Sequence, residues 1–122
     1  MVNRKILLMA ALVMLSGFLS APVLAEDESE AASRLEQGQA IAFDRKKGNC
    51  LACHWVEGGE LTGTYGPPLI AMKTRFPDRE VLRMQIWDAT IKNPDTRMPP
   101  FGRNRILTEE EIDLVTDYIH SL

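Results

Sequence analysis

The chain has 122 residues, among them 14 Lys and Arg, 17 Asp and Glu, two Cys and two His. This length fits a single domain. Beyond residue 25 the remaining 97 residues carry 12 basic and 17 acidic side chains, so the net charge there is −5 rather than the −3 of the whole chain. This acidic balance excludes a strongly basic nucleic-acid-binding protein. Two cysteines also exclude a scaffold held by several disulfides.

Residues 1–25 have the organisation of an export signal. Two basic residues precede an apolar stretch of 14 residues (6–19), and Val23 and Ala25 occupy the −3 and −1 positions of a cleavage site. An uncleaved membrane anchor is the alternative, but 14 residues fall short of the ~20 that a helix needs to cross a bilayer. We therefore expect cleavage of residues 1–25 and a mature periplasmic chain that begins near Glu26 and carries no membrane anchor.

The mature chain begins with an acidic stretch that leads into the first expected helix. Residues 26–30 contain four acidic side chains and are expected to form a mobile start. A helical pattern then runs from about Ala31 to Phe43. Gly38 lies inside this pattern, where it costs stability relative to Ala and therefore indicates close packing against another element.

A second helix is expected in the middle of the chain. Phe76-Pro77-Asp78 is its start signal, and Asn93-Pro94 ends it because proline removes a donor and restricts the preceding residue. Met84 falls within the same pattern and is expected in the core. The apolar side of the helix is expected to hold Val81, Leu82, Ile86 and Ile91.

The last helix has the clearest start signal. Thr108 and Glu111 have the spacing of a capping box, and Leu107 and Ile112 flank it as a hydrophobic staple. Apolar residues then recur at helical spacing to the end of the chain: Ile112, Val115, Ile119 and Leu122. No segment shows the alternation of a strand, so the predicted fold is small and all-α.

The two cysteines belong to one motif. Cys50-Leu51-Ala52-Cys53-His54 is the Cys-x-x-Cys-His signature of c-type haem attachment. Two thiols at this spacing can add to the two vinyl groups along one porphyrin edge. The following histidine, His54, then lies beneath the iron as an axial ligand. The motif predicts one covalently attached haem c, with Cys50 and Cys53 as its attachment residues.

The cysteines have three other possible uses. A thioredoxin-like dithiol needs a βαβ context that this helical pattern lacks. A zinc site could use Cys50, Cys53, His54 and His120, but the 66-residue gap between the histidines fits no common zinc spacing. A simple disulfide leaves His54 unexplained. The motif and the export signal together therefore favour haem.

The second axial ligand has four candidates beyond the export signal: Met72, Met84, Met98 and His120. Met84 and Met72 lie among apolar residues, so packing in the core is the alternative to ligation for both. Met98 instead lies in Arg97-Met98-Pro99-Pro100-Phe101-Gly102, where prolines stiffen the backbone and prevent a helix. We predict Met98 as the ligand. A His/Met pair raises the reduction potential and fills both axial positions, which favours electron transfer over oxygen or peroxide chemistry.

A ligating histidine usually donates its other N–H to a nearby acceptor. Gly66-Pro67-Pro68-Leu69 follows His54 by 12 to 15 residues, and the carbonyl of Pro67 is the natural acceptor there. An ordinary turn is the alternative, and the residues alone leave both open. Four aromatic residues either wall the haem or fill the core: Trp55, Tyr65, Trp87 and Phe101.

The order of these motifs resembles the class I cytochrome c fold, and within it the SoxX family, the monohaem subunits of SoxAX complexes. Four stretches carry the resemblance: 43–50, 66–69, 84–94 and 98–108. Its most specific part is the combination of Gln85-Ile86-Trp87-Asp88-Ala89 with Met98-Pro99-Pro100-Phe101-Gly102. The resemblance implies a cytochrome c domain over residues 37–122, preceded by an extension over 26–36. It also implies His54 and Met98 as axial ligands and Pro67 as the acceptor for His54.

The resemblance further implies a function in thiosulfate oxidation. SoxAX couples thiosulfate oxidatively to a cysteine of the carrier SoxYZ, an activity of the L-cysteine S-thiosulfotransferase type, and this chain would pair with a SoxA-like cytochrome subunit. Both cysteines here are used by haem, so no thiol remains for covalent sulfur chemistry. The chain would therefore carry electrons from its partner to a downstream acceptor. A free-standing electron shuttle to an oxidase or a reductase is the alternative.

Charge is unevenly distributed along the sequence. Basic residues flank the Cys-x-x-Cys-His motif and the segment around Met98: Arg45, Lys46, Lys47, Arg97, Arg103 and Arg105. We hypothesise that they surround the exposed haem edge and attract an acidic partner. The simpler interpretation is solubility, together with acidic residues that match the dipole at the start of the last helix.

Overall fold

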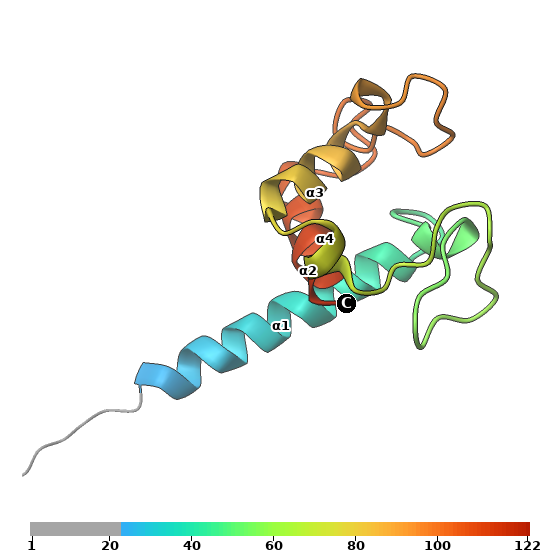
Figure 1. Cartoon of the computed structure of the whole chain (residues 1–122). Coiled ribbons are helices and arrows are strands. Elements are labelled where there is room, and N and C mark those ends of the chain that lie inside the picture. The colour runs from blue at the N-terminus through green and yellow to red at the C-terminus, as the bar shows by residue number, and fades with distance from the viewer. Residues whose placement is uncertain (1–22) are drawn as a thin grey trace, which may run out of the picture.

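The computed structural model describes residues 23–122, and over this range the chain is helical without any β-strand, which confirms the all-α prediction. Its elements are α1 (Val23–Phe43), the 3-10 turn η1 (Cys50–Ala52), α2 (Met72–Arg75), α3 (Arg79–Trp87), the 3-10 turn η2 (Ala89–Ile91) and α4 (Glu109–Ser121). Figure 1 shows α1 as a long helix that α4 crosses, with α2 and α3 beside α4. The expected export segment lies outside the described residues except for 23–25, which open α1.

Helices α1 and α4 cross at Gly38, as its position in the sequence predicts. A Cβ at this residue would overlap the carbonyl oxygen of Leu114 and lie 2.8 Å from Cβ of Tyr118. The missing side chain therefore allows the two backbones to approach closely. Beside the crossing, the rings of Phe43 and Tyr118 meet edge to face with centroids 6.0 Å apart, and Arg34 donates to Asp117 at 2.6 Å.

The start of α4 confirms the predicted capping box. The Thr108 hydroxyl accepts from the backbone N–H of Glu111 at 3.1 Å, and the Glu111 carboxylate accepts from the N–H of Thr108 at 3.0 Å. Leu107 and Ile112, the expected staple, are both buried in the core. The cap stabilises the helix by about 1 kcal/mol. It fixes where α4 begins, directly after the loop that carries Met98.

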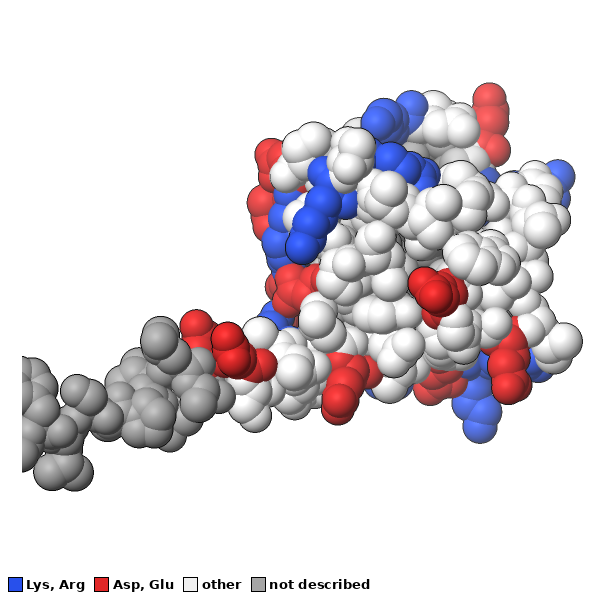
Figure 2. Space-filling model, turned by 60° about the horizontal axis from the view of Figure 1, so that its bottom comes forward, with Lys and Arg blue, Asp and Glu red and all other residues white. Residues whose placement is uncertain are grey.

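The first helix begins earlier than expected. Helix α1 starts at Val23 rather than near Ala31, so residues 27–30 are helical and solvent-exposed instead of forming a mobile start. Once a helix is nucleated, each added residue gains a hydrogen bond, and acidic side chains near the N-terminus favour the helix dipole. Figure 2 shows these acidic side chains next to the grey segment, on the part of α1 that projects from the body.

The middle helix is shorter than expected. Helix α3 begins after Asp78, whose side chain accepts from the N–H of Glu80 at 2.8 Å, and it ends at Trp87 instead of reaching Asn93. Asp88 is extended (φ −153°, ψ 92°) and accepts from the N–H of the residue two further on at 3.0 Å. Short polar side chains compete with helical hydrogen bonds in this way. The chain then continues as η2.

Only part of the expected apolar side of this segment is buried. Leu82 and Ile86 lie in the core, but Val81, Met84 and Ile91 are 49 %, 45 % and 67 % exposed. The expectation that Met84 lies in the core is therefore wrong, as it is for Val81 and Ile91. The cause is geometric: α3 covers α4 with one narrow face, which leaves Val81 and Met84 outside. Beyond the break at Asp88, η2 buries Ala89 and leaves Ile91 exposed.

The hydrophobic core joins α4 to α1, α2, α3 and the loops between them. Its buried members are Ala42, Val56, Leu69, Met72, Leu82, Ile86, Phe101, Leu107, Ile112, Val115, Tyr118 and Ile119. Several of these side chains have a second surface that lines a cavity rather than packing on protein. The core is thus organised around a hollow that contains the motif residues.

Candidate functional site

The Cys-x-x-Cys-His motif forms a tight turn. Asn49 adopts the left-handed conformation (φ 47°) and caps η1. The carbonyl of Cys50 then accepts from the N–H of Cys53 at 3.2 Å and of His54 at 2.9 Å. This turn brings Cys50, Cys53 and His54 together on the wall of one cavity. The structure therefore gathers the three motif residues at one place.

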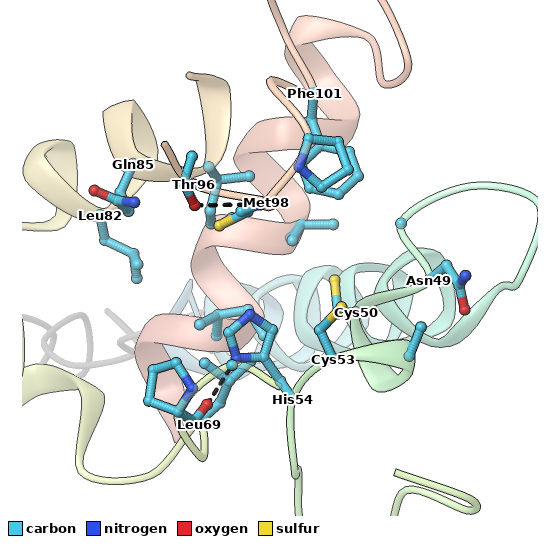
Figure 3. A pocket seen from close by; sticks show the side chains of 18 of the residues that line it. Asn49, Cys50, Cys53, His54, Leu69, Leu82, Gln85, Thr96, Met98 and Phe101 are labelled. Carbon is cyan, nitrogen blue, oxygen red and sulfur yellow. Dashed lines mark hydrogen bonds between the residues drawn. The ribbon is translucent and has the colours of Figure 1, made fainter. Parts of the chain in front are cut away.

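The cavity has a volume of about 550 Å³, within the range of cofactor and ligand sites. Apolar side chains form much of its lining, including Leu69, Leu82, Ile86 and Phe101. Figure 3 shows His54 and Met98 reaching into it from opposite sides, with Cys50 and Cys53 between them along one flank. Two potential metal ligands thus face an apolar slot whose edge carries two thiols.

The ring of His54 is held by the loop that follows it. Its Nδ1 lies 2.7 Å from the carbonyl oxygen of Pro67, which fixes Nδ1–H as the donor and leaves Nε2 available to a metal. A Cβ at Gly66 would overlap Cε1 of the imidazole and lie 2.6 Å from Nδ1. The N–H of Gly66 also donates to the carbonyl of Cys53 at 2.7 Å. Only glycine lets the backbone lie this close to the ring.

Met98 lies on an irregular loop between η2 and α4. Its N–H donates to the hydroxyl of Thr96 at 3.2 Å, and the N–H of Thr96 donates to the carbonyl of Asn93 at 3.1 Å. Pro99 and Pro100 follow and restrict the backbone. The half-buried thioether of Met98 therefore extends into the cavity from a stiff support.

The other candidate ligands are engaged elsewhere. Met72 is buried, and its sulfur accepts from Nη1 of Arg75 at 3.3 Å. Met84 lies on the outer face of α3. The Nε2 atom of His120 lies 2.9 Å from the carbonyl oxygen of Phe76. Met98 is thus the candidate whose sulfur has no other partner among the described residues and lies opposite His54.

The geometry also argues against the other uses of the cysteines. Burial raises the pKa of the Cys50 thiol to about 11, whereas a redox-active dithiol needs a lowered pKa. Within residues 23–122 no three acidic, cysteine or histidine side chains are grouped to hold a metal ion. The two cysteines are not joined by a disulfide. Two free thiols beside an apolar slot fit attachment to a haem edge.

The four aromatic residues divide between different roles. Phe101 is buried and lines the cavity, and Tyr65 lies at its rim with the guanidinium of Arg97 5.5 Å from its ring centroid. Trp55 is exposed. Trp87 does not line the cavity; it packs against the core and donates through Nε1 to a carboxylate of α4. Two of the four thus lie at the site.

The charged residues that line the cavity are all basic: Arg45, Lys47, Arg75 and Arg97. Lys47 forms an ion pair with Glu111, and Arg75 donates to the carbonyl of Pro68 at 2.7 Å. Arg103 lies elsewhere, where it pairs with Asp88 at 2.7 Å. The expected basic surround is therefore present in part, and attraction of an acidic partner stays a prediction.

Two features of the site had no role in the sequence patterns. The need for glycine at Gly66 arises from the imidazole beside it, and the Thr-x-Met spacing places a hydroxyl next to the N–H of Met98. The second is a known local signal, because threonine hydroxyls bond backbone groups two residues away. The first depends on a contact across 12 residues, which no local pattern reveals.

A cytochrome c domain is what this fold and site define, and comparison with known proteins supports that class. The family model described as cytochrome c oxidase, cbb3-type, subunit III matches residues 33–119. The chain belongs to this family and is a class I c-type cytochrome whose role is haem-based electron transfer. Haem fits the residues present, since an apolar slot lies between a histidine and a methionine with two thiols at its edge.

One curated relative is an uncharacterized lipoprotein of Aquifex aeolicus (strain VF5). It is 33% identical over 76 residues, which are 62% of this chain and 37% of the relative. This chain therefore corresponds to little more than a third of that protein. Among residues 23–122, no helix has the length and apolar character to span a membrane.

Proposed function

We propose that this chain binds one haem c covalently through thioethers to Cys50 and Cys53, with His54 and Met98 as the axial ligands of the iron. The observation that carries the proposal is the opposed placement of His54 and Met98 across an apolar cavity flanked by both thiols. Pro67 would accept the hydrogen bond from His54, which makes the imidazole a stronger ligand.

Haem with this ligand pair supplies one-electron oxidation and reduction at a raised potential. The protein residues give that chemistry its setting. Leu82, Ile86 and Phe101 line the cavity with apolar side chains and would exclude water from a haem bound there. His54 and Met98 would fill both axial positions, so no site would remain for oxygen or peroxide. The chain is suited to pass electrons and not to transform a substrate at the iron.

We propose further that the chain is the SoxX subunit of a SoxAX complex. In this role it would accept electrons when thiosulfate is coupled to a cysteine of the SoxYZ carrier. The combination of Gln85-Ile86-Trp87-Asp88-Ala89 with Met98-Pro99-Pro100-Phe101-Gly102 supports this proposal. With Cys50 and Cys53 bound to haem, the sulfur chemistry would take place on the SoxA-like partner.

A free-standing periplasmic electron shuttle is the second candidate. The description of the matching family, a subunit of a cbb3-type oxidase, favours transfer towards an oxidase. Both roles place the chain outside the cytoplasm, where cytochrome c domains usually work. Cleavage after Ala25 would remove the first three residues of α1 and leave the cavity untouched. Mass spectrometry of the exported protein should give a chain that begins near Glu26.

The attachment and the ligands are tested on the protein matured with haem. Haem should remain on the wild-type chain in a denaturing gel and be lost when both Cys50 and Cys53 are replaced by Ala. The ferrous protein should bind carbon monoxide only after Met98→Ala. Ready binding of carbon monoxide by the wild-type protein at neutral pH would contradict the proposed coordination.

The two roles are separated by purification from the native source, followed by a reduction assay. A stable complex with a second cytochrome, whose haems are reduced by thiosulfate only when the carrier is present, supports the SoxX role. A lone monomer that reduces an oxidase without such a partner supports the shuttle and contradicts the SoxX role.

A further inference from the structure

Trp87, the last residue of α3, packs against the loop that carries Met98. A Cβ at Gly102 would overlap Cδ1 and Nε1 of its indole and lie 2.5 Å from Cγ. At the same place the N–H of Gly102 donates to the carbonyl of Trp87 at 3.0 Å. The indole and the backbone carbonyl of Trp87 thus both contact Gly102, at one end of this loop.

The indole is itself held from α4. Its Nε1 donates to Oε1 of Glu109 at 2.9 Å, and Oε2 of the same carboxylate accepts from Nη2 of Arg83 at 2.7 Å. Arg83 also donates through Nε to Asp113 at 2.8 Å. Hydrogen bonds from Arg83 and Trp87 hold the pKa of Glu109 below its usual value, so this acceptor stays ionised. Trp87 therefore has a fixed orientation.

The next residue forms a second tie to the same loop. Asp88 is 3 % exposed, and its Oδ2 accepts from Nη1 of Arg103 at 2.7 Å. Its Oδ1 accepts from the hydroxyl of Thr90 at 2.5 Å. A carboxylate this buried depends on its partners, because an unpaired buried charge is strongly destabilising. Trp87, the last residue of α3, thus binds Gly102 of the loop, and Asp88, the next residue, binds Arg103 of the loop.

We propose that Trp87 and Asp88 are positioning residues that keep Met98 on the iron. Met98 is four residues from Gly102, and two of the three residues between them are prolines whose φ is fixed. A shift at Gly102 is therefore transmitted along a stiff segment to Met98. This inference rests on the proposed ligation by Met98 and adds the residues that maintain it.

The test measures how readily an added ligand displaces Met98 in the ferric, haem-loaded full chain. Imidazole is the probe, titrated while the weak long-wavelength absorption of methionine-ligated haem is followed. Trp87→Phe keeps a ring beside Gly102 but loses the donor to Glu109, and Arg103→Gln loses the charged partner of Asp88. Each variant should bind imidazole about tenfold more tightly, the factor expected for loss of one hydrogen bond to a charged group.

A matched control separates positioning from general stability. Asp117→Asn removes ion pairs of α4 with Arg34 and Arg79 at 2.6 Å and 2.5 Å, away from the loop. It should lower the urea midpoint while imidazole affinity stays at the wild-type value. If Trp87→Phe and Arg103→Gln also left imidazole affinity unchanged, the inference would be overturned even where their stability fell.

The outcomes also distinguish this inference from the proposed coordination. Wild-type protein that shows the methionine absorption, with loop variants that hold it equally well, contradicts the positioning role alone. Wild-type protein without that absorption, and with an imidazole affinity that Met98→Ala does not change, contradicts ligation by Met98. If Trp87→Phe does not fold, Arg103→Gln still decides the question.

Discussion

Replacing Gly66 with alanine is the most direct test of how the histidine side of the site is built. In the structure a Cβ at this position would overlap Cε1 of His54, with Nδ1 at 2.6 Å and Nε2 at 2.9 Å. These three atoms of the imidazole would therefore lie closer to the new Cβ than Cβ atoms in proteins approach any other atom. The ring is confined by its bond to Pro67, and the loop by the bond from Gly66 to Cys53 at 2.7 Å. Relief of the overlap requires one of these bonds to break.

The loss in the free energy of unfolding has two contributions, overpacking and a broken hydrogen bond. Overpacking a well-filled site costs about 1–3 kcal/mol, and loss of one hydrogen bond adds about 1 kcal/mol. We expect Gly66→Ala to lower the free energy of unfolding by about 2–4 kcal/mol, measured by urea unfolding of the haem-loaded protein. The reduction potential should rise as well, because a histidine without its acceptor is a weaker ligand for the ferric iron.

Gly58→Ala is the matched control. Gly58 has a φ of +75° and no atom within 4 Å of a built Cβ, so alanine there costs about 1–2 kcal/mol of backbone strain. The potential should stay at the wild-type value in this control. If Gly66→Ala matched the wild type in both urea midpoint and potential, the close approach of the loop to His54 would be refuted.

Three further predictions concern other parts of the chain. Thr108→Ala should lower the free energy of unfolding by about 1 kcal/mol in urea, because it removes the side-chain half of the capping box. Hydrogen bonds from Thr90 and the charge of Arg103 lower the pKa of Asp88; the stabilisation is present at neutral pH and is lost as pH falls below about 4. Asp88→Asn should therefore flatten the acid limb of a stability–pH curve, and an unchanged limb would contradict this. Met98→Ala should lower the reduction potential, measured by spectroelectrochemistry, because a thioether ligand raises it.

The sequence was informative where structure is decided by neighbours along the chain. The capping box at Thr108 needs residues only three apart, and it forms as predicted. The turn from Cys50 to His54 is likewise local. Gly38 predicted a close crossing because glycine inside a helix needs a reason, although the pattern could not identify Leu114 as its neighbour.

The sequence was less informative where distant packing decides. Met84 fits an apolar helical pattern as well as Leu82 does, but only one face of α3 meets α4, and Met84 lies on the other. Trp87 left two roles open: it packs against the core and does not line the cavity. Its contacts with Gly102 and Glu109, 15 and 22 residues further along the chain, had no signal in the sequence. The helix break at Asp88 had a local cause, but its buried pairing with Arg103 depends on the tertiary fold.

The two sides of the cavity use the same physical device. Irregular loops cannot satisfy their backbone groups internally, so they need partners elsewhere. The loop beside His54 reaches the haem motif through Gly66, and the loop of Met98 reaches α3 through Gly102. In both places a missing Cβ admits an aromatic ring against the backbone, which fixes ring and loop together. A small chain can in this way hold the side chains of His54 and Met98 at opposite walls of the cavity with short loops. The proposed coordination requires both side chains to stay in place in either oxidation state.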